Sequence, residues 1–283
     1  MKVVVTGAGG MLGREVITAS HSRGHEVVAL GHAALDIADP GAVEVALTTH
    51  RPQAVINCAA FTDVDGAEDD EAGAMKVNDE GAALLAAGAE SVGAKIVHPS
   101  SDYVFDGSAQ RPYVESDMPA PISAYGRSKQ AGETSVAVSN PRHFIVRASW
   151  LFGVGGKNFV ETMLRLGNEQ PEVLVVSDQV GCPTYTRHLG EALAVLLEGE
   201  DFGIHHIAAA GRCSWYEFAQ EIFDQAGVEC RVMAGTTEML ARKAPRPAYS
   251  VLGTERPEPI TLPHWKRGLA EYLAERRVGE VAA

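Results

Sequence analysis

The sequence predicts an α/β protein in which helices cover both faces of a doubly wound parallel sheet, with a smaller α/β lobe towards the C-terminus. Two observations predict this fold class. In the first half of the chain, short apolar runs rich in β-branched residues alternate with helical patterns, an order typical of a parallel sheet. Beyond about residue 151 this alternation loosens. We therefore expect one domain over residues 1–150, to which parts of about 171–200 return, and mainly a smaller lobe over 151–283.

The first element combines a strand, a glycine-rich turn and a helix. The apolar run 2–6 precedes glycines at Gly7, Gly10 and Gly13, and a helical spacing follows. A helix N-terminus suits a phosphate because its N–H groups lack intrahelical partners and the helix dipole favours negative charge. The three glycines would permit the tight turn, the approach of a pyrophosphate and close helix–strand packing. The pattern predicts a Rossmann-type dinucleotide-binding domain over residues 1–150, although an ordinary turn is the alternative for the loop alone.

A second buried strand is expected at residues 26–30, and Gly31 and His32 follow it. In many NAD-binding folds an acidic residue at this place bonds the ribose 2′-hydroxyl. Because no carboxylate is present here to repel a 2′-phosphate, we expect NADPH to be tolerated. Asp36 could lie near the adenosine, or it could simply be a loop or cap aspartate.

The remaining elements follow from the same patterns. Further strands are expected over 54–57, 95–99, 143–148, 173–176 and 203–207. Further helices are expected over 40–50, 75–90, 123–133, 158–167, 186–197, 215–225 and 265–277. The proline-rich stretch 244–252 predicts a loop. The acidic residues between 63 and 71 lack the spacing of a calcium loop, and predict a solvated helix start.

Composition excludes several classes of protein. The net charge is −13 and no lysine- or arginine-rich block occurs, so no nucleic acid partner is expected. None of the four cysteines forms a C-x-x-C pair, which favours reduced thiols in a cytoplasmic protein. The chain opens directly into a strand, which leaves no room for a signal peptide. The longest uncharged helical stretch, 81–89, is far shorter than the roughly 20 residues that span a bilayer, so no membrane partner is expected.

The candidate chemistry lies at Ser101, Tyr125 and Lys129. The last two are four residues apart and share one helix face. Reduction of a ketone needs a hydride at the carbon and a proton at the oxygen. A free tyrosine, with a pKa near about 10, is poorly matched to neutral pH, so we expect the ammonium of Lys129 to lower the pKa of Tyr125. Lys129 can also bond the nicotinamide ribose, and Ser101 would donate to the substrate oxygen. The alternatives are a core-edge tyrosine, a solvated lysine and a capping serine.

These motifs resemble the extended branch of the short-chain dehydrogenase/reductase superfamily, and within it the family of dTDP-4-dehydrorhamnose reductases. The resemblance covers nearly the whole chain. It rests on residues 7–13, 35–37, 55–60, 101–105, 125–129, 149–150, 178–184 and 246–252. The Ser-Asp-Tyr-Val-Phe stretch at 101–105 and the Asp-Gln…Gly…Pro-Thr stretch at 178–184 are far more specific than the glycine loop.

The resemblance implies reduction of the 4-keto group of dTDP-4-dehydro-L-rhamnose to dTDP-L-rhamnose with NADPH or NADH, within dTDP-rhamnose and carbohydrate biosynthesis. It makes Tyr125 the proton donor, Lys129 its partner and Ser101 the hydroxyl that tunes the site. For the cofactor it implies Gly10, Met11 and Leu12 at the phosphates, with Asp36, Ile37, Ala60, Phe61 and Thr62 lining the rest of the site. For the dTDP-sugar it implies Ser101, Asp102 and Trp150. We add Arg246 for the diphosphate, because a planar, permanently charged fork suits phosphate oxygens.

The sequence departs from this family at three points. Ser101 stands where many members have threonine, and the hydroxyl is retained. Some members bridge a homodimer through magnesium; Glu15 and Glu191 are compatible with that, but Arg187 would repel a dication, so no metal is expected and a homodimer stays open. Tyr103 replaces the second carboxylate of related sugar-nucleotide dehydratases.

Two alternatives to this activity stay open. The first is a 4-ketoreductase acting on another dTDP-deoxysugar, since both activities would use the same site. The second is a non-catalytic NADP-binding regulatory subunit, because a fold alone does not imply turnover.

Overall fold

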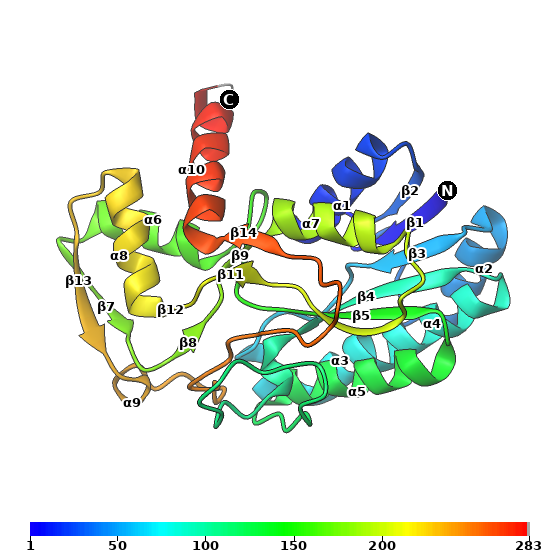
Figure 1. The fold of residues 1–283 in the computed structure, drawn as a ribbon, viewed down its shortest axis with the longest axis horizontal. Helices are drawn as coiled ribbons and strands as arrows, with labels where there is room; N and C mark the ends of the chain where they lie inside the picture. The colour runs from blue at the N-terminus through cyan, green and yellow to red at the C-terminus, as the bar shows by residue number, and fades with distance from the viewer. Residues whose placement is uncertain (282–283) are drawn as a thin grey trace.

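The computed structural model describes residues 1–281 and is built on one six-stranded parallel sheet with the order β10-β5-β4-β3-β1-β2 (Figure 1). The strands are β1 (Lys2–Thr6), β2 (Glu26–Leu30), β3 (Ala54–Asn57), β4 (Lys95–Ser101), β5 (His143–Ala148) and β10 (Gly203–His206). The strand order reverses beside β1, and open parallel sheets bind ligands in the crevice at such a point, outside the carboxyl ends of the strands.

Helices cover both faces of this sheet (Figure 1). One face carries α1 (Met11–Ser22) and α7 (Thr186–Leu196), which pack against each other. The other carries α2 (Pro40–His50), α4 (Ala82–Ser91) and α5 (Ala124–Ser139). A separate apolar core lies under each layer, the first centred on strand valines and α7 leucines, the second on α2, α4 and α5. This arrangement confirms the predicted doubly wound α/β class.

Two local expectations are corrected. β2 was expected to be buried, but it lies at the sheet edge, where its side chains are partly exposed because no further strand covers them. The helix expected over 75–90 is divided: α3 (Glu71–Met75) leads into a π-helical turn, Lys76–Gly81, before α4 begins. Helix α5 passes very close to this turn, since a Cβ at Gly132 would lie 2.0 Å from the carbonyl oxygen of Asn78.

The lobe surrounds a third core, rich in aromatic residues. Its helices are α6 (Phe159–Glu169), α8 (Trp215–Ala226), α9 (Thr237–Leu240) and α10 (Trp265–Val281). Its main parallel pair is β7 (Glu172–Val176) with β13 (Arg231–Gly235). Short strands complete it: β6 (Leu151–Phe152), β8 (Val180–Gly181), β9 (Thr184–Tyr185), β11 (Ala209–Ala210), β12 (Cys213–Ser214) and β14 (Leu262–His264). The chain leaves the lobe to form α7 and β10, so elements from beyond residue 150 complete the larger sheet; the domain division itself stays a prediction.

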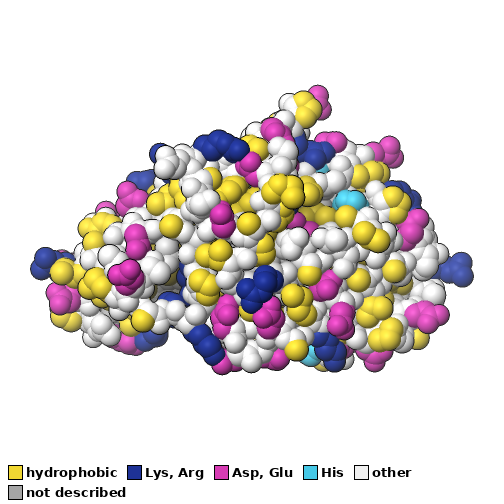
Figure 2. All heavy atoms as spheres, turned by 90° about the horizontal axis from the view of Figure 1, so that it is seen from below, with side chains coloured by type: hydrophobic (Ala, Val, Ile, Leu, Met, Phe, Trp, Pro, Cys, Tyr) yellow, Lys and Arg dark blue, Asp and Glu magenta, His cyan; other side chains and the backbone are white. Residues whose placement is uncertain are grey.

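The surface carries charges of both signs. Figure 2 shows acidic and basic side chains interspersed over the face seen from below, without a broad basic patch there. Within residues 1–281, none of the helices combines the length and the apolar character needed to cross a bilayer.

Candidate active site

The glycine turn after β1 forms a cradle that side chains would fill. Gly7 has a φ of +61°, and a Cβ on it would lie 2.4 Å from the backbone of Cys58. A Cβ on Gly13 would lie 2.3 Å from the carbonyl oxygen of Gly7. Gly10 precedes α1 and provides no side-chain cap, so the N–H groups of the first turn stay available. These features fit the diphosphate of a dinucleotide.

The other expected cofactor residues lie near this turn in the fold. Residues 60–62 follow β3, and the peptide of Phe61 is held by the Asn78 side chain through hydrogen bonds of 2.9 and 3.0 Å. Asp36 is exposed and accepts a 3.0 Å hydrogen bond from the amide of Ala38, which is the loop role considered above, whereas Asp39 caps α2. The side chain of Ile37 is only 3% exposed and lies in the core, so this residue offers a ligand its backbone alone.

The structure brings Ser101 and Tyr125 together. Ser101 ends β4, and its hydroxyl is hydrogen-bonded to the phenol of Tyr125 from α5. Ser123 caps α5 by accepting from the amide of Gly126 at 3.1 Å, which fixes the first turn where Tyr125 lies. One turn further, the buried ammonium of Lys129 donates to the carbonyl of Pro99 at 2.8 Å. Three polar groups from two neighbouring elements thus line one side of the candidate site.

The expectation that the pKa of Tyr125 is lowered is wrong, because the net shift is upward. Burial raises the pKa of Tyr125 to about 12; the hydrogen bond from Ser101 opposes this rise and the charge of Asp102 adds to it. Burial also lowers the pKa of Lys129 to about 8, against the opposing effect of Glu133. The desolvation of the phenolate outweighs any stabilisation by the ammonium, which is directed at a backbone carbonyl. Tyr125 is therefore held as a neutral phenol, the form that can donate a proton.

Asp102 is a buried carboxyl surrounded by hydroxyl groups. It is 2% exposed and accepts hydrogen bonds from Ser101 and Ser149, both at 3.2 Å, and from Ser250. Burial raises the pKa of Asp102 to about 6, although the hydrogen bonds oppose the rise. The sequence reasoning gave no role to Ser149 or Ser250. Both serines lie in stretches on which the family resemblance rests, 149–150 and 246–252, and this placement was the signal that could have identified them.

Trp150 comes directly after Ser149, which donates a hydrogen bond to this carboxyl group. It follows β5, and its ring stacks on the ring of Trp215 with centroids 3.5 Å apart. Sequence reasoning also missed Trp215. The available signal was the Ser-x-x-Glu pattern starting at Ser214, a capping box that makes an aromatic residue the first of helix α8.

Arg246 is held by a carboxylate rather than lying free. Its guanidinium forms hydrogen bonds of 3.0 and 2.9 Å with Asp65, and another with the hydroxyl of Tyr103. The acidic stretch was predicted to be a solvated helix start, and that holds for Asp70, which caps α3. For Asp65 the prediction is wrong, because this carboxylate binds the loop that carries Arg246. The hydrogen bond from Arg246 lowers the pKa of Asp65.

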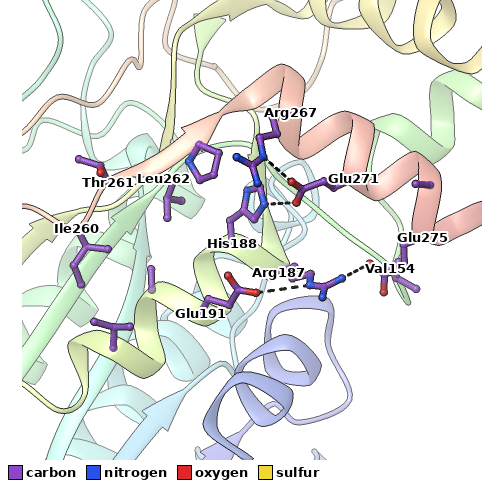
Figure 3. Close-up of a pocket in the computed structure, with 14 residues that line it drawn as sticks. Val154, Arg187, His188, Glu191, Ile260, Thr261, Leu262, Arg267, Glu271 and Glu275 are labelled. Carbon is purple, nitrogen blue, oxygen red and sulfur yellow. Dashed lines mark hydrogen bonds and ion pairs between the residues drawn. The ribbon is translucent and has the colours of Figure 1, made fainter. Parts of the chain in front are cut away.

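A groove of about 1010 Å³ lies elsewhere, between α7 and α10 (Figure 3). Figure 3 shows Arg187 between two acidic side chains, with ion pairs of 3.7 Å to Glu191 and 3.8 Å to Glu275. Burial and the neighbouring Glu275 raise the pKa of Glu15. The guanidinium of Arg187 lies among these carboxyl groups and would repel a divalent cation bound to them, although its one positive charge does not neutralise all three. Among the residues that the structure describes, no group of three or more histidine, cysteine or acidic side chains is arranged to hold a metal ion.

Comparisons with known proteins identify the family that this chain resembles over nearly its whole length. The family model described as the RmlD substrate binding domain matches residues 1–278. A dTDP-4-dehydrorhamnose reductase of Streptomyces griseus is 45% identical over 280 residues, which covers 95% of this chain and 91% of that protein. A probable dTDP-4,6-dihydroxy-2-methyloxan-3-one 4-ketoreductase of Streptomyces antibioticus is 44% identical over 261 residues, 90% of this chain and 88% of that one.

A solved structure extends the similarity to the fold. The dTDP-4-dehydrorhamnose reductase of Bacillus anthracis, in complex with NADP, has a TM-score of 0.94 and 38% identity, and covers 97% of this chain and 99% of its own. The match of the family model and this agreement over nearly the whole length confirm the resemblance drawn from the motifs. The chain therefore belongs to the RmlD family, that of the dTDP-4-dehydrorhamnose reductases, which are oxidoreductases.

Proposed function

We propose that this protein reduces the 4-keto group of dTDP-4-dehydro-L-rhamnose to give dTDP-L-rhamnose, with NADPH as the reductant and NADH as the alternative. The observation that carries the proposal is the contact between the hydroxyl of Ser101 and the half-buried, neutral phenol of Tyr125, on the helix face that also presents the buried Lys129. Relatives named as reductases of dTDP-4-keto sugars support the substrate class.

The glycine turn would hold the cofactor by its diphosphate, through the N–H groups that begin at Met11 and Leu12. Bound NADPH supplies a hydride to the carbonyl carbon. Gly31 and His32 follow β2 and present no carboxylate to the ribose, which supports NADPH. Lys129 would hydrogen-bond the nicotinamide ribose, and residues 60–62 would line the pocket beside it.

Tyr125 would donate its phenolic proton to the carbonyl oxygen as the alcohol forms. Ser101 would support this step, since its hydrogen bond lowers the pKa of Tyr125 and so stabilises the phenolate left behind. Asp102 accepts the single proton of Ser101 at rest, so this proton would turn to Tyr125 as the phenolate forms. Trp150 would form a wall of the sugar pocket, and Arg246 would bind the diphosphate of the dTDP group.

The test is turnover of purified protein with dTDP-4-dehydro-L-rhamnose, followed by NADPH absorbance. Tyr125→Phe removes only the phenolic oxygen, so kcat should fall by at least about 100-fold, the usual worth of a positioned acid, while the Kd of NADPH stays within about twofold. Tyr216→Phe, in the half-buried first turn of α8, is the matched control and should leave kcat unchanged. Unchanged kcat in Tyr125→Phe would remove this residue from the mechanism.

A second candidate is reduction of another dTDP-linked 4-keto sugar. The observation that favours it is the 44% identity to a probable 4-ketoreductase acting on a different dTDP sugar. Comparison of kcat/KM across several 4-keto dTDP sugars separates the two. Binding of NADPH without reduction of any of them would favour the regulatory-subunit alternative.

A further inference from the structure

Trp150 and Trp215 form a flat aromatic stack between the two parts of the molecule. Their ring centroids lie 3.5 Å apart and their planes differ by 5°. Trp150 follows β5 of the six-stranded sheet, whereas Trp215 is the first residue of α8 in the lobe. The stack therefore connects a residue proposed to contact the sugar with a helix that the proposed mechanism does not use.

The backbone of Trp150 is held in an unfavourable conformation. Its φ is +49°, a region that bulky residues rarely adopt and that persists only where the surroundings enforce it. The ring also lies directly against Gly181, since a Cβ there would be 2.4 to 2.7 Å from three of its atoms. This explains the glycine at position 181. The indole of Trp150 is thus bounded by Gly181 and by the ring of Trp215.

Trp215 is anchored independently of its partner. Ser214 and Glu217 close a capping box around the start of α8, which fixes the backbone at Trp215. The indole packs against the aromatic core of the lobe and lies 4.5 Å from the ring of Phe159. Trp150, by contrast, is not a member of that core. The lobe therefore fixes the position of Trp215, and Trp215 in turn fixes the ring of Trp150 by stacking on it.

We propose that Trp215 is a positioning residue for the sugar subsite: its indole holds the Trp150 ring in the orientation that contacts the sugar of a dTDP-linked substrate. This inference rests on the proposed function. A ring that is already ordered loses less conformational freedom when a ligand binds, so the stack should improve affinity for the sugar nucleotide and leave the chemical step unchanged.

The test compares Trp215→Leu with Trp215→Phe, which keeps a ring for stacking. Trp215→Leu should raise the KM for dTDP-4-dehydro-L-rhamnose about tenfold, the upper range for an aromatic pair, with kcat and the Kd of NADPH within about twofold. Trp215→Phe should restore most of the affinity. Gly181→Ala should raise the same KM, since it displaces the Trp150 ring from the other contact.

The matched control is Trp265→Phe. Trp265 is 3% exposed in the same lobe, and its ring contacts Phe218 and His264 rather than either stacked tryptophan. This variant should lower Tm without changing KM. If Trp215→Leu lowers Tm and leaves KM at the wild-type value, as the control does, Trp215 is only structural and the inference is wrong.

A binding measurement separates this inference from the proposed activity. The chain has three tryptophans, so in the Trp265→Phe background the tryptophan emission, excited selectively over that of the tyrosines, comes from the stacked pair alone. Titration with dTDP-L-rhamnose should change this emission saturably, and adding Trp215→Leu should weaken the binding about tenfold. Binding with this dependence but no turnover of any dTDP-4-keto sugar would overturn the proposed function alone. Turnover with binding unaffected by Trp215→Leu, or no binding at all, would overturn the inference.

Discussion

Arg246 and Asp65, 181 residues apart in the sequence, are joined by two parallel hydrogen bonds of 3.0 and 2.9 Å. The amide of Ala244 donates to the same carboxylate at 3.0 Å, so Asp65 binds the loop as well as the guanidinium. Lys243 pairs with Asp69 beside it. The loop that carries Arg246 is therefore fastened to the segment after β3, and the cation is kept near Tyr103 in the candidate site.

Replacement of Arg246 tests its role as the diphosphate ligand. Arg246→Gln should raise the KM for the dTDP sugar by about 10- to 100-fold, the worth of charge-assisted hydrogen bonds, with the Kd of NADPH unchanged. Arg256→Gln is the matched control, because Arg256 is equally buried, with side-chain exposures of 17% and 16%, and pairs with Asp201 instead. If both variants lose stability and neither changes KM, Arg246 serves only to fasten the loop.

Asp102 should make stability depend on pH. Burial raises its pKa to about 6, so its contribution to stability is fully present below the unfolded value of about 3.9 and is lost as pH rises through 6. Asp102→Asn removes this titration and nearly keeps the shape. The free energy of unfolding of the variant, relative to the wild type, should increase by about 3 kcal/mol from pH 4 to pH 8 in urea titrations. A difference that is constant over this range would show that Asp102 titrates normally.

The end of β2 should set the preference between NADPH and NADH. A Cβ at Gly31 would meet no atom within 4 Å, so Gly31→Asp introduces its first side-chain atom into open space. The added carboxylate should repel the 2′-phosphate and raise the Kd of NADPH about tenfold, with the Kd of NADH little changed. Gly31→Asn has the same size without the charge. An equal loss of NADPH affinity in both variants would point to steric exclusion instead of charge.

A buried ion pair beneath the site should contribute strongly to stability. Arg147 and Glu133 are 2.8 Å apart with side chains 1% and 6% exposed. Glu133→Gln leaves a buried guanidinium without its counter-charge and should cost about 3 to 5 kcal/mol in chemical denaturation. Glu90→Gln breaks the exposed pair with Arg142 and should cost less than about 1 kcal/mol. Similar losses in the two variants would mean that water reaches the inner pair.

Much of the fold could be predicted because its signals are local. Alternating apolar runs and helical spacings identified the strands and helices, and the glycine spacing identified the turn at β1. The edge position of β2 could not be predicted, because strand order depends on pairing between distant segments. The π-helical turn at Lys76–Gly81 was also missed, since it lies in a stretch whose composition suits an ordinary helix.

The candidate site, like the fold, has features that local sequence signals predict and features that depend on packing. Tyr125 and Lys129 could be paired from their spacing on one helix, and Ser101 from its place at the end of a strand. Their ionisation could not be predicted correctly, because the pKa of Tyr125 depends on how deeply packing buries it.

By itself, the sequence determined most of the helices and strands of the larger domain and the glycine turn after β1, and it supplied the candidate hydroxyl, phenol and amine, because these follow from spacings within a few residues. Only the tertiary structure decided that Asp102 is enclosed by three serines, that Trp150 stacks on Trp215 and that Arg246 is held by Asp65. These contacts join segments far apart in the chain, and burial, which governs their charge and orientation, exists only once the chain is packed.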